Sequence, residues 1–142
     1  MVGERRTSNE DNIRALIETW ARAVSAGNRK AILAHHSPDL VMFDFPNEIR
    51  GIDAYDKTWD FFFANPRGRI VFEPKQIEIT AGDDVAFAVC LFHCDGTSGG
   101  ALDFRLTTGL RRQGDEWVIV HEHHSVRTVE ERFTDPATRA QE

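Results

Sequence analysis

The 142-residue sequence has little that would mark a membrane or nucleic-acid-binding protein. Its longest uninterrupted apolar run is the eight residues Val85–Phe92, whereas a helix needs about 20 to cross a bilayer. The N-terminus carries charges but no apolar stretch behind them, so we expect no signal peptide. Lys and Arg number 17 against 23 Asp and Glu and form no basic stripe. We therefore expect no nucleic-acid and no membrane partner.

Cysteine is scarce as well, with two residues in the chain, Cys90 and Cys94. They are four positions apart in an expected strand, where their Cα atoms would be about 13 Å apart. A disulfide requires Cα atoms within about 7 Å. We expect two reduced, buried thiols and a cytoplasmic protein.

Apolar residues make up 41% and charged residues 28% of the chain, as in an ordinary globular domain. This length corresponds to one domain. We predict a single domain over residues 1–127, with a flexible N-terminus at residues 1–9 and a polar C-terminal tail at residues 128–142.

Three helices are predicted near the N-terminus. The first begins with Ser8 as its N-cap and ends at Gly27. Its apolar positions recur at helical spacing: Ile13, Leu16, Ile17, Trp20 and Val24. The second helix is expected over Arg29–His36, and the third over Ala54–Ala64 with Asp53 as its cap.

The remaining segments have the composition and turn spacing of strands. The predicted strands are Leu40–Phe45, Arg69–Thr80, Asp84–Cys94, Ala101–Gln113 and Glu116–Arg127, with Pro46–Gly51 as a loop. The last four follow one another through short turns, so neighbours must be antiparallel. The order α-α-β-α-β-β-β-β predicts an α+β fold in which a curved antiparallel sheet wraps around three N-terminal helices. Such a sheet leaves a concavity at its open end, where small molecules bind.

Several segments together resemble a known family. They are Trp20–Asn28, Asp39–Asp44, Gly51 with Trp59 and Phe62, and Trp117–Ser125. Over about residues 10–127 the chain resembles the ketosteroid isomerase-like, or SnoaL-like, superfamily, which has the cone-shaped nuclear transport factor two-like fold. Its last strand resembles that of uncharacterised ketosteroid isomerase homologues. The resemblance implies a pocket but not a reaction, because this fold serves isomerases, cyclases, dehydratases, binding modules and assembly domains.

The resemblance implies that Asp44 occupies the place of the general base of ketosteroid isomerase. Trp20 stands where that enzyme has its oxyanion-hole tyrosine. The position of the second, protonated aspartate donor falls near Thr108 or Gly109, which have no carboxyl group. We therefore do not expect steroid isomerase activity itself. Asp44 lies in an apolar strand, where desolvation would raise its pKa and suit it to act as a base. The alternative is a surface or turn-capping role.

Alternation along the last strand places His121, His123 and Ser125 on one face with Trp117 and Ile119. Because the last two are core-like, we predict that this face points inward. His123 is then a candidate catalytic residue that polarises a carbonyl oxygen, and His121 and Ser125 are candidate ligand-binding residues. A histidine pair satisfied by its neighbours is the structural alternative.

Three further predictions concern ligands. Arg105 binds an acidic ligand or pairs with Asp44 or Asp103, and the sequence leaves open which face of its strand points inward. Trp20, Trp59 and Phe62 are expected to line the pocket. His121, His123 and Asp44 permit a metal site, but we predict no metal and no cofactor.

These observations predict a small-molecule pocket protein. If it is an enzyme, it performs acid–base chemistry on a hydrophobic carbonyl compound: isomerisation, dehydration or cyclisation. The alternatives are a non-catalytic ligand-binding module and an oligomerisation module of the same fold. The expected partners are a small hydrophobic molecule and a second copy of the chain, which would cover the sheet face near Phe72, Val85 or Phe87.

Overall fold

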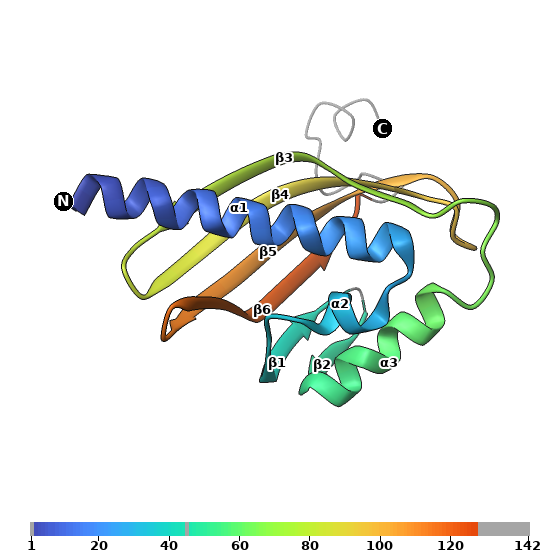
Figure 1. Cartoon of the computed structure of the whole chain (residues 1–142). Coiled ribbons are helices and arrows are strands. Elements are labelled where there is room, and N and C mark those ends of the chain that lie inside the picture. The colour runs from blue at the N-terminus through green and yellow to red at the C-terminus, as the bar shows by residue number, and fades with distance from the viewer. Residues whose placement is uncertain (1, 45, 128–142) are drawn as a thin grey trace, which may run out of the picture.

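The computed structural model describes residues 2–44 and 46–127 (Figure 1). Its helices are α1 (Val2–Ala26), α2 (Arg29–Leu33) and α3 (Ile52–Phe62). Its strands are β1 (His36–Phe43), β2 (Glu48–Arg50), β3 (Val71–Ala81), β4 (Val85–Asp95), β5 (Leu102–Gln113) and β6 (Glu116–Ser125). The predicted α+β class is confirmed. The predicted tail and Phe45 lie outside the described residues.

The six strands form one sheet in the order β2-β1-β6-β5-β4-β3. Strands β3 to β6 are antiparallel neighbours, as predicted. The sheet is mixed, however, because β1 pairs with β6 in parallel. The segment predicted as a loop contains the short strand β2, which pairs with β1. The predicted element order therefore lacked one strand.

The first helix starts earlier than predicted, because residues 2–9 continue α1 rather than forming a flexible end. Asn9 is buried, and its side-chain amide donates a 3.0 Å hydrogen bond to the Gly82 carbonyl in the β3–β4 turn. The guanidinium group of Arg112 in β5 donates a hydrogen bond to the side-chain oxygen of Asn9, Oδ1. These contacts hold the N-terminal part of α1 against the sheet. They favour a helix that extends to the N-terminal side of Ser8.

The second helix ends at Leu33, and β1 begins at His36, earlier than predicted in both cases. The change of direction occurs at His35, the only non-glycine residue with a positive φ (62°) in the described part of the chain. Its carbonyl accepts a 2.7 Å hydrogen bond from the Ile119 amide. His36 is thereby placed at the start of the sheet, paired with Ile119.

The third helix is held against β1 at its first residue. Its N-cap is Gly51, with φ 91°, rather than the predicted Asp53. The Gly51 amide donates a 2.8 Å hydrogen bond to the Leu40 carbonyl. Arg29 of α2 adds ion pairs of 2.6 Å to Asp56 and 2.9 Å to Asp60. The position of α3 relative to β1 is therefore fixed from both sides.

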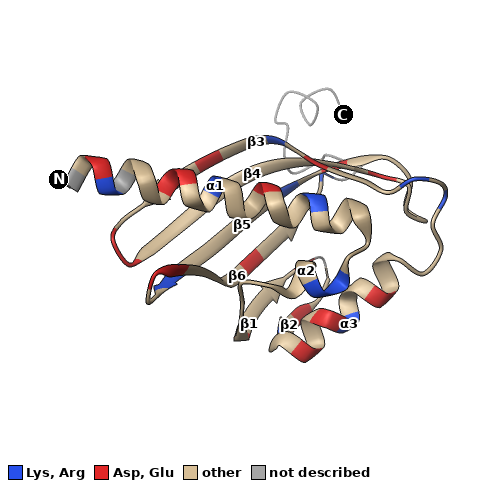
Figure 2. Ribbon diagram, in the orientation of Figure 1, with Lys and Arg blue, Asp and Glu red and all other residues tan. Residues whose placement is uncertain are grey.

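One face of the sheet is covered by helices and the other is not (Figure 1). Helix α1 runs along β3 and neighbouring strands, while α3 lies beside β1 and β2. Lys and Arg are scattered among Asp and Glu over the described part of the chain and form no stripe (Figure 2). No helix within the described ranges combines the length and hydropathy needed to cross a membrane.

Between the helices and the sheet lies an aromatic core. Six rings from α1, α3 and strands β3 to β5 pack mainly edge to face, with centroid separations of 5.0–6.4 Å. They are Trp20, Trp59, Phe62, Phe72, Phe92 and Phe104. Phe72 is thus buried, and the prediction that it lies on an exposed sheet face is wrong. Cys90 and Cys94 are both free and buried, as predicted.

Prediction: the loop after β4 depends on Gly96. Its φ is 87°, and a Cβ there would overlap the backbone carbonyl of Arg69. Gly100 has a similar φ of 76° but open space around the added carbon. We expect Gly100→Ala to lower the free energy of unfolding by about 1 kcal/mol, the cost of a positive φ. Gly96→Ala should cost about 1–3 kcal/mol more, the penalty of overpacking. Equal losses in urea unfolding would contradict this.

Candidate functional site

A cavity of about 340 Å³ opens at one end of the sheet beside α3. Its walls come from the ends of β1, β4 and β6, the start of β3 and β5, and one face of α3. The apolar lining consists of Met42, Trp59, Phe61, Phe62, Phe72, Leu102, Phe104 and Val126. Its mouth is marked by Phe61, which is 83% exposed. The cavity suits a small, largely apolar ligand.

Several polar or titratable side chains interrupt this lining: Asp44, Thr58, Cys94, Thr97, His124 and Ser125. Thr58 and Ser125 are hydrogen-bonded to neighbouring residues. Thr58 donates to the Tyr55 carbonyl at 2.6 Å, and Ser125 accepts from Arg105 at 3.1 Å. Burial raises the pKa of the Cys94 thiol to about 11, so this group is a neutral thiol at neutral pH. Asp44 and His124 are the groups suited to proton transfer.

A β-bulge in β6 decides which histidine reaches the cavity. Gly109 of β5 pairs with His121, but its neighbour Leu110 pairs with Ile119, so Val120 has no partner in β5. One extra residue reverses the side-chain alternation beyond it. Glu122 and His124 consequently face inward, opposite Thr108 and Leu106.

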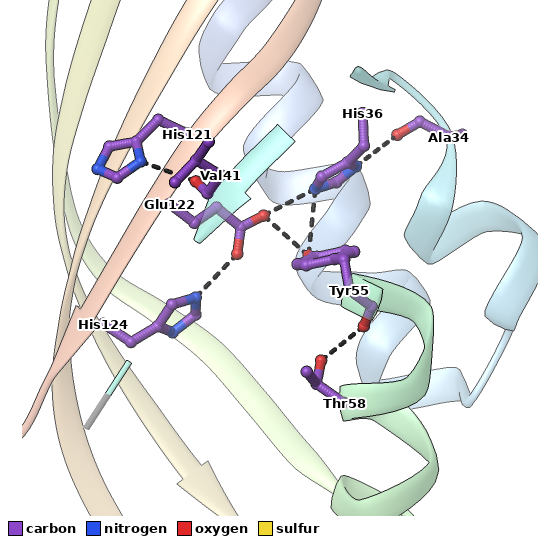
Figure 3. A network of polar contacts seen from close by, with 8 residues as sticks. All are labelled: Ala34, His36, Val41, Tyr55, Thr58, His121, Glu122 and His124. Atoms are coloured by element: carbon purple, nitrogen blue, oxygen red, sulfur yellow. Dashed lines mark hydrogen bonds and ion pairs between the residues drawn. The ribbon is translucent and has the colours of Figure 1, made fainter. Parts of the chain in front are cut away.

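The bulge buries the Glu122 carboxylate, which is 1% exposed, beneath α3. One oxygen, Oε2, accepts from the Tyr55 hydroxyl at 2.8 Å and from His36 Nε2 at 2.7 Å. The other oxygen, Oε1, accepts from His124 Nε2 at 2.8 Å. Figure 3 shows the three donors converging on the carboxylate from α3, β1 and β6.

This network keeps Glu122 ionised. Burial alone would raise the pKa of its carboxyl, but hydrogen bonds from His124 and His36, together with the positive charge of His36, outweigh burial and hold the pKa well below its ordinary value. Tyr55 is neutral, because burial and then the Glu122 charge raise the pKa of its hydroxyl. The indole N–H groups of Trp20 and Trp59 also lower that pKa, although neither makes a hydrogen bond of regular geometry.

His124 is oriented by this carboxylate. Its Nε2 donates to Glu122, so in the neutral ring the proton is on Nε2 and the lone pair is on Nδ1. Figure 3 shows the second ring nitrogen on the side of the ring away from Glu122. No described residue forms a hydrogen bond with it. An imidazole held by a buried carboxylate, with its second nitrogen unbonded in a cavity lining, is suited to act as a general base.

Asp44 follows the last paired residue of β1. Phe43 pairs with His123 in the parallel β1–β6 ladder, so Asp44 is adjacent to His124. Neighbouring strands lie about 4.8 Å apart, and both side chains line the same cavity. The Asp44 carboxylate also accepts a 3.3 Å hydrogen bond from the Asn47 amide. Both the pocket position and the turn-capping position considered for Asp44 are therefore realised.

Three residues predicted to face a ligand lie on the outer face of the sheet instead. His123 is exposed and contacts the Phe43 ring, while His121 Nδ1 donates a 2.7 Å hydrogen bond to the Val41 carbonyl. Arg105 is exposed and bonds Ser125 and the Val126 carbonyl, not Asp44 or Asp103. The predicted inward orientation of His121 and His123 is wrong, because the bulge at Val120 was not anticipated. For Arg105 the sequence left the orientation open, and its side chain lies on the exposed face.

Of the three aromatic residues predicted to line the pocket, two do so and one does not. Trp59 and Phe62 line the cavity, as expected of ligand-contacting residues. Trp20 is buried in the core and is not part of this lining. Ser125 lies at the cavity edge. Whether any of these residues binds a ligand stays a prediction.

Sequence reasoning missed Glu122, His124, His36 and Tyr55. The available signal was the run His121-Glu-His-His124. In a strand, one face of this run carries two histidines and the other face carries a glutamate and a histidine. Choosing the face required the bulge. His36 was assigned to a helix end, and its partner Glu122 is 86 positions away, so no local pattern could join them.

The alternative of a metal site is not supported by the arrangement of side chains. His121 and His123 lie on the outer face with ring centroids 6.4 Å apart, while Asp44 lines the cavity. Within residues 2–44 and 46–127, no group of three or more His, Cys, Asp or Glu is arranged to hold a metal ion.

Comparison with known proteins agrees with this architecture. The SnoaL-like domain family matches residues 13–128. An NTF2-like protein of unknown function from Pseudomonas putida is 35% identical, with a TM-score of 0.76, over 84% of this chain and 87% of that one. No curated protein matches the sequence.

Two more distant structures share the fold. A Shewanella frigidimarina protein proposed to be a ketosteroid isomerase is 19% identical, with a TM-score of 0.65, over 78% of this chain and 92% of that one. A Streptomyces avermitilis protein of the NTF2-like family, proposed to be a dehydratase, is 13% identical, with a TM-score of 0.74, over 85% and 97%.

Prediction: Glu122→Gln lowers the free energy of unfolding at pH 7 by about 3–5 kcal/mol, because His36 loses the charge that compensates it. The folded-state pKa of Glu122 is depressed, so its contribution is present above the ordinary glutamate pKa and lost as pH falls through and below it. The difference between wild type and variant in urea unfolding should therefore shrink between pH 6 and pH 3.

The matched control is Glu116→Gln, an exposed glutamate on the same strand, which should leave stability unchanged. Tyr55→Phe provides a milder test, with an expected loss of about 1.5–3 kcal/mol for one hydrogen bond to a charged group. A Glu122→Gln variant as stable as wild type at pH 7 would refute the ionised network.

Proposed function

Because the chain belongs to the SnoaL-like domain family, we propose that it is an acid–base enzyme that acts on a small hydrophobic carbonyl compound without a cofactor. The single observation that carries this proposal is the placement of His124 and Asp44 in one apolar cavity, with His124 oriented by a buried carboxylate. Isomerisation, dehydration and aldol-type cyclisation share the first step of proton removal beside a carbonyl group, and the proposal covers this step.

In that step His124 Nδ1 takes a proton from the carbon next to the substrate carbonyl. The C–H electron pair moves into the adjacent bond, and the carbonyl oxygen becomes an enolate oxygen. Glu122 stabilises the resulting imidazolium through the Nε2 hydrogen bond. The His124 imidazolium then returns this proton to the product or to its leaving group, while the Asp44 carboxylate, which lines the same cavity, stabilises the imidazolium. The surrounding aromatic side chains exclude water and strengthen these interactions.

The proposal differs from the family's steroid isomerase chemistry. The position of that enzyme's oxyanion tyrosine is Trp20, which is buried in the core. Thr108, near the position of the second donor, is also buried, opposite Glu122 in the ladder. Support for another carbonyl substrate comes from the hydroxyl of Thr97, which lines the cavity and can donate to a developing oxyanion.

Prediction: the full-length protein catalyses exchange of the α-protons of a hydrophobic ketone with deuterium oxide, followed by NMR on a panel of cyclic ketones and enones. His124→Gln should lower the exchange rate by about 10²–10⁴-fold, the contribution of a general base. Asp44→Asn should also lower it, with the fold intact by circular dichroism. The matched control is His93→Gln, which alters an exposed histidine paired with Asp103.

Two outcomes would overturn the proposal. If His123→Gln abolishes exchange while His124→Gln does not, the catalytic histidine is the one that the sequence alone favoured. If panel compounds raise the melting temperature but none exchanges, the protein is a ligand-binding module without turnover.

We further propose that a second copy of the chain covers the outer sheet face. Along β4 an apolar row, 43–67% exposed, comprises Val85, Phe87, Val89 and Leu91. The flanking strands differ in charge on this face: β3 has Glu73 and Glu78, and β5 has Arg105 and Arg111. The one acidic residue of β5 on this face, Asp103, is paired with His93 of β4. A two-fold axis along β4 would place the acidic flank of each copy on the basic flank of the other. A self-complementary face favours a homodimer.

Prediction: wild type runs as a dimer in size-exclusion chromatography with light scattering, and Phe87→Arg shifts it to monomer. A charge in the middle of an apolar interface is left without compensation. Phe61→Arg is the control, since it alters another exposed phenylalanine, at the cavity mouth and away from the sheet face. A monomeric wild type, or dimers from both variants, would contradict the proposed interface.

The cytoplasm is the compartment that we propose. Both cysteines are free thiols, which is the usual state in a reducing compartment.

A further inference from the structure

His36 is the member of the buried network that does not reach the cavity. Its side chain is fully buried, and its ring stacks on Tyr55 with centroids 4.9 Å apart. Both ring nitrogens face acceptors. Nδ1 lies 3.0 Å from the Ala34 carbonyl, and Nε2 lies 2.7 Å from Glu122 Oε2 and 3.2 Å from the Tyr55 hydroxyl. The Tyr55 hydroxyl donates its proton to Glu122, and a carbonyl oxygen and an ionised carboxylate cannot donate. This arrangement is satisfied when both ring nitrogens carry protons, as in an imidazolium.

This imidazolium balances the charge of Glu122. Among the described residues, no Lys or Arg forms an ion pair with that carboxylate, and its titratable partners of basic type are His36 and His124. The Tyr55 hydroxyl contributes a hydrogen bond but no charge. With the proton on His36, the Glu122–His36 pair is neutral overall, and His124 has no uncompensated anion to attract a second proton.

We propose that His36 acts as a positioning residue that keeps His124 neutral, so that Nδ1 retains the lone pair with which it takes a proton from the substrate. The inference rests on the proposed function for its catalytic consequence, but its electrostatic part stands on the network alone. Without His36, the single negative charge of Glu122 would be shared with His124, which would become the imidazolium. A protonated His124 has no lone pair and cannot act as a base.

Other groups also act on His124 and set the background for the test. Asp44 and Cys94 face it across the cavity lining from β1 and β4. Asp44 adds negative charge that favours protonation, whereas the neutral thiol adds none. The ring of Phe104 on β5 stacks on His124 with centroids 5.7 Å apart and contributes burial. A compensating cation at Glu122 is therefore needed to keep His124 neutral beside Asp44.

The first experiment needs no variant. Long-range ¹⁵N–¹H NMR of the histidine rings in the full chain distinguishes imidazolium from each neutral tautomer. We expect His36 to have both nitrogens protonated up to at least pH 8, and His124 to be the Nε2–H tautomer at pH 7. A neutral His36 at pH 7, or a protonated His124, would overturn the inference whether or not the protein is an enzyme.

The second experiment removes the charge and keeps a donor. In His36→Gln the titration midpoint of His124, followed by the same spectra, should rise by at least one pH unit. In the pH profile of the α-proton exchange rate, the midpoint of the acid limb should move to higher pH by the same amount. Exchange should then fall about tenfold or more at pH 6 and recover at high pH. Asp44→Asn combined with His36→Gln should lower the midpoint again, because one anion is gone.

Tyr55→Phe is the matched control, because it removes a hydrogen bond to the same oxygen without removing a charge. It should move the midpoint of His124 by less than half the change seen in His36→Gln. If both variants lose stability equally and leave the midpoint of His124 unmoved, His36 has only a structural role. If the midpoint moves but no ketone exchanges, the electrostatic inference holds and the proposed enzymatic function fails.

Discussion

A carboxylate buried without water must receive enough hydrogen bonds and positive charge to remain ionised, and the inner end of this protein is organised around that requirement at Glu122. Three elements meet there because each brings one donor: His36 from β1, Tyr55 from α3 and His124 from β6. The starts of β1 and α3, which differ from the sequence prediction, help to form these hydrogen bonds to Glu122. The positive φ at His35 turns the chain so that His36 enters the sheet, and Gly51 sets α3 against β1 so that Tyr55 faces inward.

The bulge at Val120 has a comparable role within β6. In a regular strand the residues that share a face with Ile119 would be His121 and His123. The added residue exchanges that pair for Glu122 and His124. Bulges frequently redirect side chains next to functional sites. Here the redirected pair couples the core to the cavity, since Glu122 contacts the buried network and His124 contacts the cavity lining.

Most of the fold was predictable from the sequence, because periodicity and turn composition are local properties. The four strands after α3 were placed within a few residues, and the amphipathic pattern of α1 correctly identified its buried face. The candidate site was less accessible. Asp44, Trp59 and Phe62 were found through their setting in apolar segments and through the family resemblance. The bulge depends on how β5 and β6 pair, and the partnership of His36 with Glu122 depends on a parallel ladder between distant segments. Neither the bulge nor this contact produces a recognisable pattern in the neighbouring sequence.

The parallel pairing of β1 with β6 has a consequence for the order of assembly during synthesis. His36 leaves the ribosome 86 residues before its carboxylate partner. Until the last strand emerges, β1 lacks its parallel neighbour, and the aromatic interior remains open along one side. A nascent chain therefore contains most of the helices and strands before it can form the buried hydrogen-bond network. A chain that stops before residue 122 lacks the carboxylate of that network. Co-translational protection by a chaperone would matter most in that interval.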